Sequence, residues 1–334
     1  METRKIGKSD VTVTAMAFGA WAIGGWMWGG ADESDALIAI RTAYDAGITT
    51  IDTAPIYGFG KSEELVGKAM EGIPRDRYQL LTKFGMNWQS QDGEFYFDTV
   101  DNGKPVKVYK WSSAKRVLRE CEDSLRRLKT DYIDLYQIHW PDSTTPIHET
   151  FEAVQKLIEQ GKVRAAGVCN YNIHQVKEAL DTIDIASNQV PYSLVNRDIE
   201  NEVIPQALEK HIGIIAYSPL QRGLLTGKIK PGHQFNEGDT REGNRFYTDE
   251  SIRKINDLLN EVKPIAEKHG ASLAQVIINW TIQQPGITCA LVGARNSAQV
   301  NDNVKALSFR LSTEELEKIT SLTDQFSVAK PTTV

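Results

Sequence analysis

Short apolar runs and amphipathic segments alternate along most of this 334-residue chain, and few folds accommodate such a pattern. A buried parallel strand is a short apolar run, and the helix that returns the chain to the next strand is amphipathic. Eight strands, each followed by a helical segment, favour a closed (β/α)₈ TIM barrel over an open doubly wound sheet. The predicted strands cover residues 15–18, 49–51, 78–82, 133–138, 163–168, 186–190, 212–217 and 289–292.

The helical segments carry local start and stop signals. Capping-box patterns at Ser272 and Ser312 each predict the start of a helix. Thr145 and Pro146 predict a cap followed by a proline in the first helical position, and Gly47 predicts a helix end. The predicted helices cover residues 34–46, 62–70, 117–128, a segment that ends at 159, 173–180, 203–210, 273–284, 298–306 and a final helix from 313.

Two long stretches, 87–111 and 221–249, show neither the apolar run of a strand nor the amphipathic spacing of a helix. They follow the third and the seventh predicted strand, so we expect long loops at the rim where barrel enzymes place substrate and cofactor contacts. A β-hairpin is predicted over residues 5–13 at the N-terminus. Because no linker-like composition interrupts the chain, we expect a single barrel domain over residues 1–334.

Composition excludes several classes of protein. The net charge of −6 disfavours binding to nucleic acid or to an anionic membrane over a wide protein surface. The uncharged stretch 11–31 is broken by glycines, which argues against a membrane span. Three separated cysteines without a CxxC pair indicate neither a disulfide framework nor a zinc ribbon. The charged N-terminus lacks an apolar core of a signal peptide, so we expect a cytoplasmic location.

Four titratable residues follow three consecutive predicted strands. Asp52 ends the second strand and is followed by Tyr57, Lys83 ends the third, and His139 ends the fourth. The carboxyl ends of barrel strands meet at one rim, so these side chains form a candidate proton-transfer site. A lysine beside a tyrosine lowers the pKa of the phenol, and a carboxylate keeps the lysine charged and oriented. A histidine can donate to a substrate carbonyl oxygen.

Each of these residues also has a purely structural interpretation. Asp52 can form a turn, Tyr57 can be a surface aromatic, Lys83 can be an ion-pair partner, and His139 can be a hydrogen-bonded core residue. All four interpretations would have to hold together at the functional rim, so we favour the catalytic one. The sequence contains no GxGxxG fingerprint, no Walker A motif, and no HxH or HExxH pair, so we expect neither a Rossmann site nor a metal.

With these residues the chain resembles the aldo-keto reductases, (β/α)₈ barrels that use a nicotinamide cofactor without a Rossmann fold. It is similar over nearly its whole length, most of all to the prokaryotic branch that also resembles the potassium-channel β subunits. The motifs that carry the resemblance are DTAPIYG at 52–58, LYQIHW at 135–140, GVCN at 167–170, YSPL at 217–220, LTGK at 225–228 and VGAR at 292–295.

The resemblance implies NADP(H)-dependent reduction of an aldehyde or ketone to an alcohol, or the reverse oxidation. Tyr57 would be the proton donor, and Lys83 would tune its pKa. Asp52 would hold Lys83, and His139 would orient the carbonyl. Arg295 favours NADP(H) over NAD(H), because a guanidinium can bind a 2′-phosphate. The cofactor contacts would be Trp21, Asp52, Cys169, Asn170, Gln189, Tyr217, Ser218, Pro219, Leu220, Gly223, Lys228, Gly293, Arg295, Gln299, Asp302 and Asn303.

Within that set, Cys169 stands where the family pattern usually has serine, and a thiol is a weaker donor than a hydroxyl. A small-molecule substrate is expected beside the rim-loop tryptophans, and nothing in the sequence selects between sugars and aromatic carbonyls. Three alternatives stay open: a sugar or polyol dehydrogenase, a Schiff-base lyase that uses Lys83, and a cofactor-sensing binding protein. The oligomeric state is left open. Substrate contacts are expected from Trp21, Trp26, Trp28, Tyr57, Trp88 and His139, with Trp111 as a further candidate.

Overall fold

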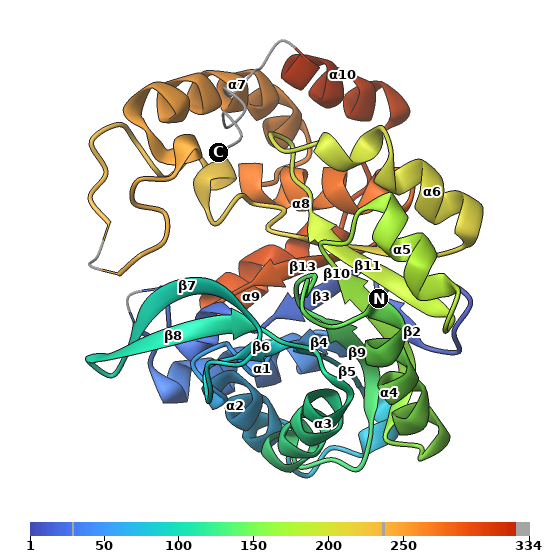
Figure 1. Cartoon of the computed structure of the whole chain (residues 1–334). Helices are drawn as coiled ribbons and strands as arrows, with labels where there is room; N and C mark the ends of the chain where they lie inside the picture. Colours follow the sequence, from blue (N-terminus) through green and yellow to red (C-terminus); the bar gives the residue numbers. More distant parts are fainter. Residues whose placement is uncertain (29, 236–237, 325–334) are drawn as a thin grey trace.

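The computed structural model describes residues 1–28, 30–235 and 238–324, and its centre is a closed barrel of eight parallel strands (Figure 1). The last barrel strand pairs with the first, through Ala290–Gly293 against Met16–Gly19, which closes the ring. This arrangement confirms the predicted (β/α)₈ fold. The barrel strands are β3 (Met16–Gly19), β4 (Thr50–Asp52), β5 (Gln79–Phe84), β9 (Ile133–Ile138), β10 (Val163–Cys169), β11 (Ile185–Pro191), β12 (Gly213–Tyr217) and β13 (Ile287–Gly293).

Helices surround the barrel, and most of them bury one apolar face. In the third of them Val117, Cys121, Leu125 and Leu128 are buried, at the spacing of an amphipathic helix. The helices are α1 (Glu33–Asp45), α2 (Lys61–Ala69), α3 (Ala114–Leu128), α4 (Ile147–Glu159), α5 (Ile173–Leu180), α6 (Val203–Lys210), α7 (Asp249–Lys268), α8 (Leu273–Gln283), α9 (Ser297–Val304) and α10 (Thr313–Asp324). Short 3₁₀ turns occur at η1 (Ala22–Gly24), η2 (Arg75–Arg77), η3 (Asp198–Glu200), η4 (Leu224–Thr226), η5 (Arg245–Tyr247) and η6 (Lys305–Leu307).

Most of the predicted helix boundaries are confirmed. Ser272 caps α8 in a reciprocal capping box, and Ser312 accepts from the backbone N–H of Glu315 at the start of α10. Gly47 follows α1 with a φ of 90°, a left-handed conformation that glycine adopts without strain. The prediction for α4 is wrong in detail, because Pro146 is the N-cap itself and no side chain caps the helix.

One prediction about the long segments is wrong, and one helix outside them was not predicted. Residues 87–111 are not an irregular loop but lie mostly in an antiparallel ribbon of β6 (Met86–Asn87), β7 (Glu94–Asp101) and β8 (Lys104–Lys110). Asn102 and Gly103 turn the ribbon with φ values of 47° and 78°, which is the Asn-Gly signal of a tight hairpin. Helix α7 was also missed. It buries Ile252, Ile255 and Leu259 at helical spacing, although Pro264 lies within it.

The two ends of the barrel differ in what covers them. The predicted N-terminal hairpin is confirmed as β1 (Thr3–Lys5) paired antiparallel with β2 (Thr12–Thr14). Ile6, Val11 and Val13 of this hairpin are buried in one apolar cluster with Leu81 and Leu135 from the barrel interior. The hairpin therefore closes the amino end of the barrel. The predicted site residues lie at the opposite end, where the strands terminate.

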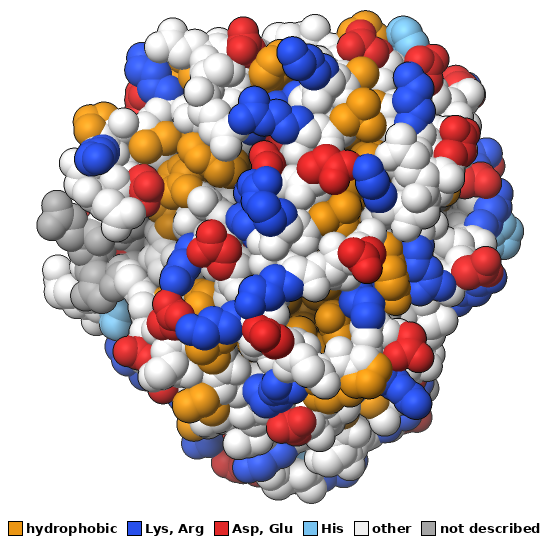
Figure 2. All heavy atoms as spheres, turned by 90° about the horizontal axis from the view of Figure 1, so that it is seen from below, with side chains coloured by type: hydrophobic (Ala, Val, Ile, Leu, Met, Phe, Trp, Pro, Cys, Tyr) orange, Lys and Arg blue, Asp and Glu red, His pale blue; other side chains and the backbone are white. Residues whose placement is uncertain are grey.

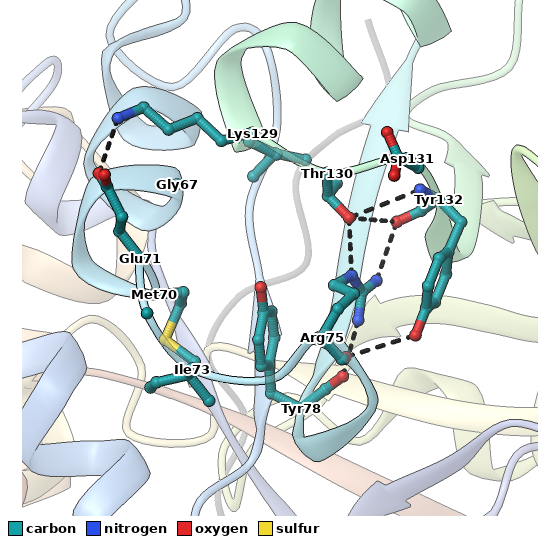
Figure 3. Close-up of a pocket in the computed structure, with 12 residues that line it drawn as sticks. Gly67, Met70, Glu71, Ile73, Arg75, Tyr78, Lys129, Thr130, Asp131 and Tyr132 are labelled. Atoms are coloured by element: carbon teal, nitrogen blue, oxygen red, sulfur yellow. Dashed lines mark hydrogen bonds and ion pairs between the residues drawn. The ribbon is translucent and has the colours of Figure 1, made fainter.

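A cavity lies at the amino ends of β5 and β9, between α2 and α3 (Figure 3). Arg75 points between the rings of Tyr78 and Tyr132, with its guanidinium carbon 4.8 and 3.9 Å from their centres. Its donors already bind Thr130, two backbone carbonyls and the buried carboxylate of Asp134. With its guanidinium donors engaged in this way, Arg75 serves the structure of this face rather than a ligand.

The surface shows charges of both signs. On the face seen in Figure 2, Lys and Arg side chains are interspersed with Asp and Glu, without one continuous basic area. No helix among the described residues is long and apolar enough to span a membrane. The last ten residues of the predicted 1–334 domain, 325–334, lie outside the described residues.

Candidate active site

The centre of the site is a buried ion pair between two barrel strands. Lys83 at the end of β5 donates from Nζ to Asp52 Oδ1 at 2.6 Å and to the carbonyl of Thr53 at 2.9 Å. Asp52 and Lys83 are 2% and 0% exposed. Burial lowers the pKa of Lys83, but the interactions with Asp52 and Tyr57 raise this pKa by more than burial lowers it. The net shift is therefore upward, and the amine stays charged. A charge this deeply buried needs such a partner.

Tyr57 lies directly over this pair. Its ring centre is 4.9 Å from Lys83 Nζ, and its ring is stacked on Trp21 at 6.0 Å. Burial raises the pKa of Tyr57 to about 12, although Lys83 pulls the pKa down. Lys83 thus acts in the direction expected from the sequence, but burial outweighs it. The phenol therefore keeps its proton at neutral pH and is able to donate it.

His139 completes the group of four. Its ring lies edge-on to Tyr57, with centres 5.6 Å apart and planes at 83°. Burial, and then the charge of Lys83, hold the pKa of His139 well below its ordinary value, so the imidazole is neutral. Its Nδ1 is buried without a hydrogen-bond partner among the described residues. A neutral imidazole can donate a hydrogen bond to a carbonyl oxygen, and this role suits His139 better than that of a proton source.

Two glutamines bind the same carboxylate from further around the barrel. Gln189 Nε2 donates to Asp52 Oδ2 at 2.9 Å, and Gln137 Nε2 lies 3.4 Å from that oxygen. Gln137 also lies 3.9 Å from Cys169 Sγ. Sequence reasoning named Gln189 as a nicotinamide contact and missed Gln137. Gln137 lies on β9, two residues before His139, and alternate residues along a strand share a face. This spacing was the available signal for Gln137.

The nicotinamide-end residues lie beside this core. Tyr217 OH donates to Asn170 Oδ1 at 3.0 Å, and Asn170 Nδ2 donates to the carbonyl of His139 at 3.2 Å. Asn170 and Ser218 have φ values of 59° and 57°. Non-glycine residues seldom adopt this left-handed conformation, and where they do so it is often at functional sites.

The residues expected at the pyrophosphate and adenosine end are spread along the same rim. Lys228 and Arg295 are exposed, and no ion pair joins either of them to a described residue. Asp302 accepts from Gln275 at 2.7 Å, so its carboxylate is already engaged. The other predicted contacts of this end lie in the segment after β12 or around α9, and they are Pro219, Leu220, Gly223, Gly293, Gln299 and Asn303.

The predicted substrate tryptophans form two groups. Trp21 and Trp28 pack edge to face at 5.3 Å, next to Tyr57. Trp26 and Trp88 instead flank Phe59, and the indole of Trp26 donates to Thr99 on the β7–β8 ribbon at 3.0 Å. The ribbon therefore forms one wall beside the site. The rim aromatics Tyr96, Phe97 and Trp140, which the sequence analysis did not select, belong to the same cluster.

These residues fit a nicotinamide dinucleotide. Polar groups of Asn170, Tyr217 and Ser218 lie at or just after the ends of β10 and β12. The cations Lys228 and Arg295, which have no ion-pair partner among the described residues, lie in the segments after β12 and β13. This sequence of groups matches the amide, aromatic and anionic parts of such a molecule. No cluster of three His, Cys, Asp or Glu side chains suited to a metal ion is found in the described part of the chain.

Comparison with known proteins places these observations in context. The sequence model of the "Aldo/keto reductase family" matches residues 15–324. The chain is 36% identical to "Aldo-keto reductase YhdN" of Bacillus subtilis over 96% of its length and 93% of that protein. It is 34% identical to the "NADH-specific methylglyoxal reductase" of Escherichia coli, covering 93% and 95% of the two chains. The solved glycerol dehydrogenase AKR11B4 from Gluconobacter oxydans superposes with a TM-score of 0.88 at 36% identity, covering 99% and 98%.

Proposed function

The chain belongs to the aldo/keto reductase family and is an oxidoreductase that reduces carbonyl groups, and we propose that Tyr57 supplies the proton in this reaction. When bound, a nicotinamide cofactor supplies the hydride to the carbonyl carbon. The observation that carries the proposal is the stack of Tyr57 over the buried Lys83–Asp52 pair, with His139 at its edge.

Each residue then has one task. Tyr57 holds a proton at neutral pH and releases it to the carbonyl oxygen as negative charge develops there. Lys83 stabilises the phenolate that remains, and Asp52 keeps Lys83 charged and in position. The neutral His139 donates a hydrogen bond that orients the carbonyl oxygen. In the reverse direction the same phenolate accepts the proton of an alcohol.

The reverse direction has specific support, because the similar Gluconobacter oxydans structure is a glycerol dehydrogenase. A sugar or polyol dehydrogenase is therefore the second candidate, and it uses the same residues. A binding protein without turnover is disfavoured because all four residues of the proton-transfer group are present and in contact range. A Schiff-base role for Lys83 is also disfavoured, because that amine is charged and bound to Asp52.

We further propose NADP(H) as the preferred cofactor. Arg295 is exposed at the rim just before α9 and has no carboxylate partner among the described residues, so it is available to a 2′-phosphate. The relative from Escherichia coli is described as NADH-specific, so this preference has to be measured for each chain. A cytoplasmic location and a single catalytic unit over residues 1–334 also remain proposals.

Tyr57→Phe tests the catalytic proposal. Removing the phenolic oxygen should lower kcat for carbonyl reduction by about 10²- to 10⁴-fold, the range of general acid catalysis. The dissociation constant of the reduced cofactor, measured by fluorescence titration, should change by less than about twofold, because the lost group acts in the transition state. Tyr44→Phe, a matched change on α1 away from the site, should leave both quantities unchanged. Turnover of Tyr57→Phe near the unmodified rate would refute the assignment.

A further inference from the structure

A hollow lies at the amino end of the barrel, at the opposite end from Tyr57 and His139. Its volume is about 440 Å³, which is in the range of pockets that bind small molecules. Its walls are the N-terminal hairpin, the segment from the end of α6 to the start of β12, the turn between α8 and β13, and residue 310 before α10. None of its lining residues belongs to the proton-transfer group or to the expected cofactor contacts.

The walls of this hollow are joined to one another by direct contacts. Arg4 donates from Nη1 to the carbonyls of Ile282 at 2.8 Å and Ile287 at 2.9 Å, which fixes the hairpin against the α8–β13 turn. Gly7 has a φ of 52°, and a Cβ added to it would lie 2.8 Å from the carbonyl oxygen of His211. The hairpin therefore also lies against the end of α6. The hollow is preformed, as small-molecule sites usually are.

The ionisable side chains that line this hollow are all basic. Lys5, His211 and Arg310 line it together with Arg4, and in the described part of the chain no Asp or Glu does. The exposed side chains of His211 and Arg310 make no hydrogen bond or ion pair with a described residue. Lys5 Nζ lies 3.8 Å from a carboxylate oxygen of Asp10, which is 97% exposed, and such a contact contributes little. Three side chains thus keep donors free for a ligand.

The cavity at the amino ends of β5 and β9 differs in this respect (Figure 3). There Lys129 donates to Glu71 at 2.9 Å, and Arg75 binds Asp134 at 2.6 Å, so both cations have a carboxylate. The hollow beside the hairpin gathers its basic groups without close carboxylates, in a chain whose net charge is −6. Like charges repel one another, and an anion bound between them would remove that repulsion.

An apolar wall adjoins the basic groups. Leu208 of α6 lines the hollow and is 56% exposed. A Cβ added to Gly286 would lie 2.6 Å from Ile204 Cγ2 and 3.7 Å from Leu208 Cγ, so the α8–β13 turn lies directly against α6. Apolar surface here can be buried by a ligand at the same time as the donors bind its charge. This combination suits a molecule with an apolar body and one anionic group.

We propose that this hollow binds a small organic anion, with Lys5 and Arg310 on its anionic group and Leu208 against its apolar body. The anionic group is a phosphate or a carboxylate, because a guanidinium can bind either through two parallel hydrogen bonds. His211 is a further donor. Since the hollow and the proton-transfer group lie at opposite ends of the barrel, the molecule bound here does not take part in carbonyl reduction. The inference therefore goes beyond the proposed function and does not depend on it.

The test is a calorimetric titration of the enzyme saturated with NADPH, so that anion contacts at the cofactor end are already occupied. The probes are phenyl phosphate, benzoate and inorganic phosphate, in a buffer without other phosphates or carboxylates. The variants are Lys5→Gln, Arg310→Gln, both together, and Leu208→Ala. The controls are Lys104→Gln at the exposed turn of the β7–β8 ribbon and Arg119→Gln on α3, where the side chain is 68% exposed.

We expect phenyl phosphate or benzoate to bind with a dissociation constant of about 1 mM or below. Lys5→Gln and Arg310→Gln should each raise this constant about fivefold or more, and the double variant should raise it further, because each removes a charged donor. Both controls should stay within about twofold of the unmodified enzyme. Leu208→Ala should weaken phenyl phosphate but not inorganic phosphate, because only the former has an apolar body. The tighter of the two aromatic probes identifies the anionic group as phosphate or carboxylate.

Two results overturn the proposal. Neither aromatic probe may bind to the unmodified enzyme at up to about 10 mM, in which case the hollow is no anion site. Binding that is equal in the double variant and in the two controls shows that the probe binds elsewhere on the molecule. Thermal unfolding of each variant verifies folding, and all the replaced side chains are exposed. Carbonyl reduction is not the readout, so a failure of the proposed function would leave these titrations valid.

Discussion

Replacing Lys83 with methionine removes the positive charge from the centre of the barrel and leaves the carboxylate of Asp52 behind. Asp52 is 2% exposed and, within the described part of the chain, would keep only the amide donors of Gln189 at 2.9 Å and Gln137 at 3.4 Å. Breaking a buried ion pair by removing one partner typically costs about 3–5 kcal/mol. The two remaining amide bonds offset part of this, so we expect a loss of about 3 kcal/mol in the free energy of unfolding.

The partner variants separate the charge effect from the loss of packing. Asp52→Asn alone leaves Lys83 buried without a counter-charge and should be destabilised to a similar extent. The double variant Asp52→Asn with Lys83→Met has no unpaired charge. It should therefore recover at least about 2 kcal/mol relative to the sum of the single losses, because the two residues are in contact.

Urea unfolding followed by tryptophan fluorescence measures these free energies. Carbonyl reduction should be strongly reduced in Lys83→Met and in the stable double variant, because the charge that supports Tyr57 is gone. It should also fall in Asp52→Asn, because Lys83 then lacks the carboxylate that keeps it charged and in position. The reasoning would be refuted if Lys83→Met lost less than about 1 kcal/mol, or if the two single losses were simply additive. Either result would mean that the carboxylate of Asp52 does not depend on Lys83.

Two further variants test the histidine and the cofactor end. Burial, and then Lys83, keep the pKa of His139 well below 6.5, so below that pH the unfolded chain takes up a proton that the folded chain does not. The free energy of unfolding should therefore fall as the pH drops below 6.5, by up to about 1.4 kcal/mol per pH unit from this group. His139→Gln should remove that part of the slope between about pH 6.5 and 5, and equal slopes in urea titrations of both proteins would contradict this. Arg295→Gln should lower the ratio of NADPH to NADH affinity about tenfold in fluorescence titrations, and an unchanged ratio would remove Arg295 from the 2′-phosphate site.

Part of the site was accessible from local sequence because it depends on strand ends. Asp52, Lys83 and His139 each end or follow a short apolar run, and parallel strands in a barrel bring their carboxyl ends to one rim. The ribbon β7–β8 also carried a local signal, because Asn102-Gly103 is typical of a tight hairpin turn. Without a long periodic run on either side, the sequence was interpreted as a loop. Helix α7 was not predicted although Ile252, Ile255 and Leu259 have helical spacing, and Pro264, which disfavours a helix interior, lies inside that pattern.

The amino-acid sequence by itself determined the eight-strand barrel, the N-terminal hairpin and the four residues that we propose for proton transfer, because apolar periodicity and strand ends are local properties. Only the tertiary structure decided the pKa of Tyr57, since burial by many distant residues outweighs the one lysine beside it. Strand register decided that Gln137 lies level with Lys83 and within reach of Asp52. Lys5 and Arg310 line one hollow because the N-terminal hairpin lies against the α8–β13 turn, which brings together segments about 300 residues apart in the chain, a distance over which no sequence period carries information.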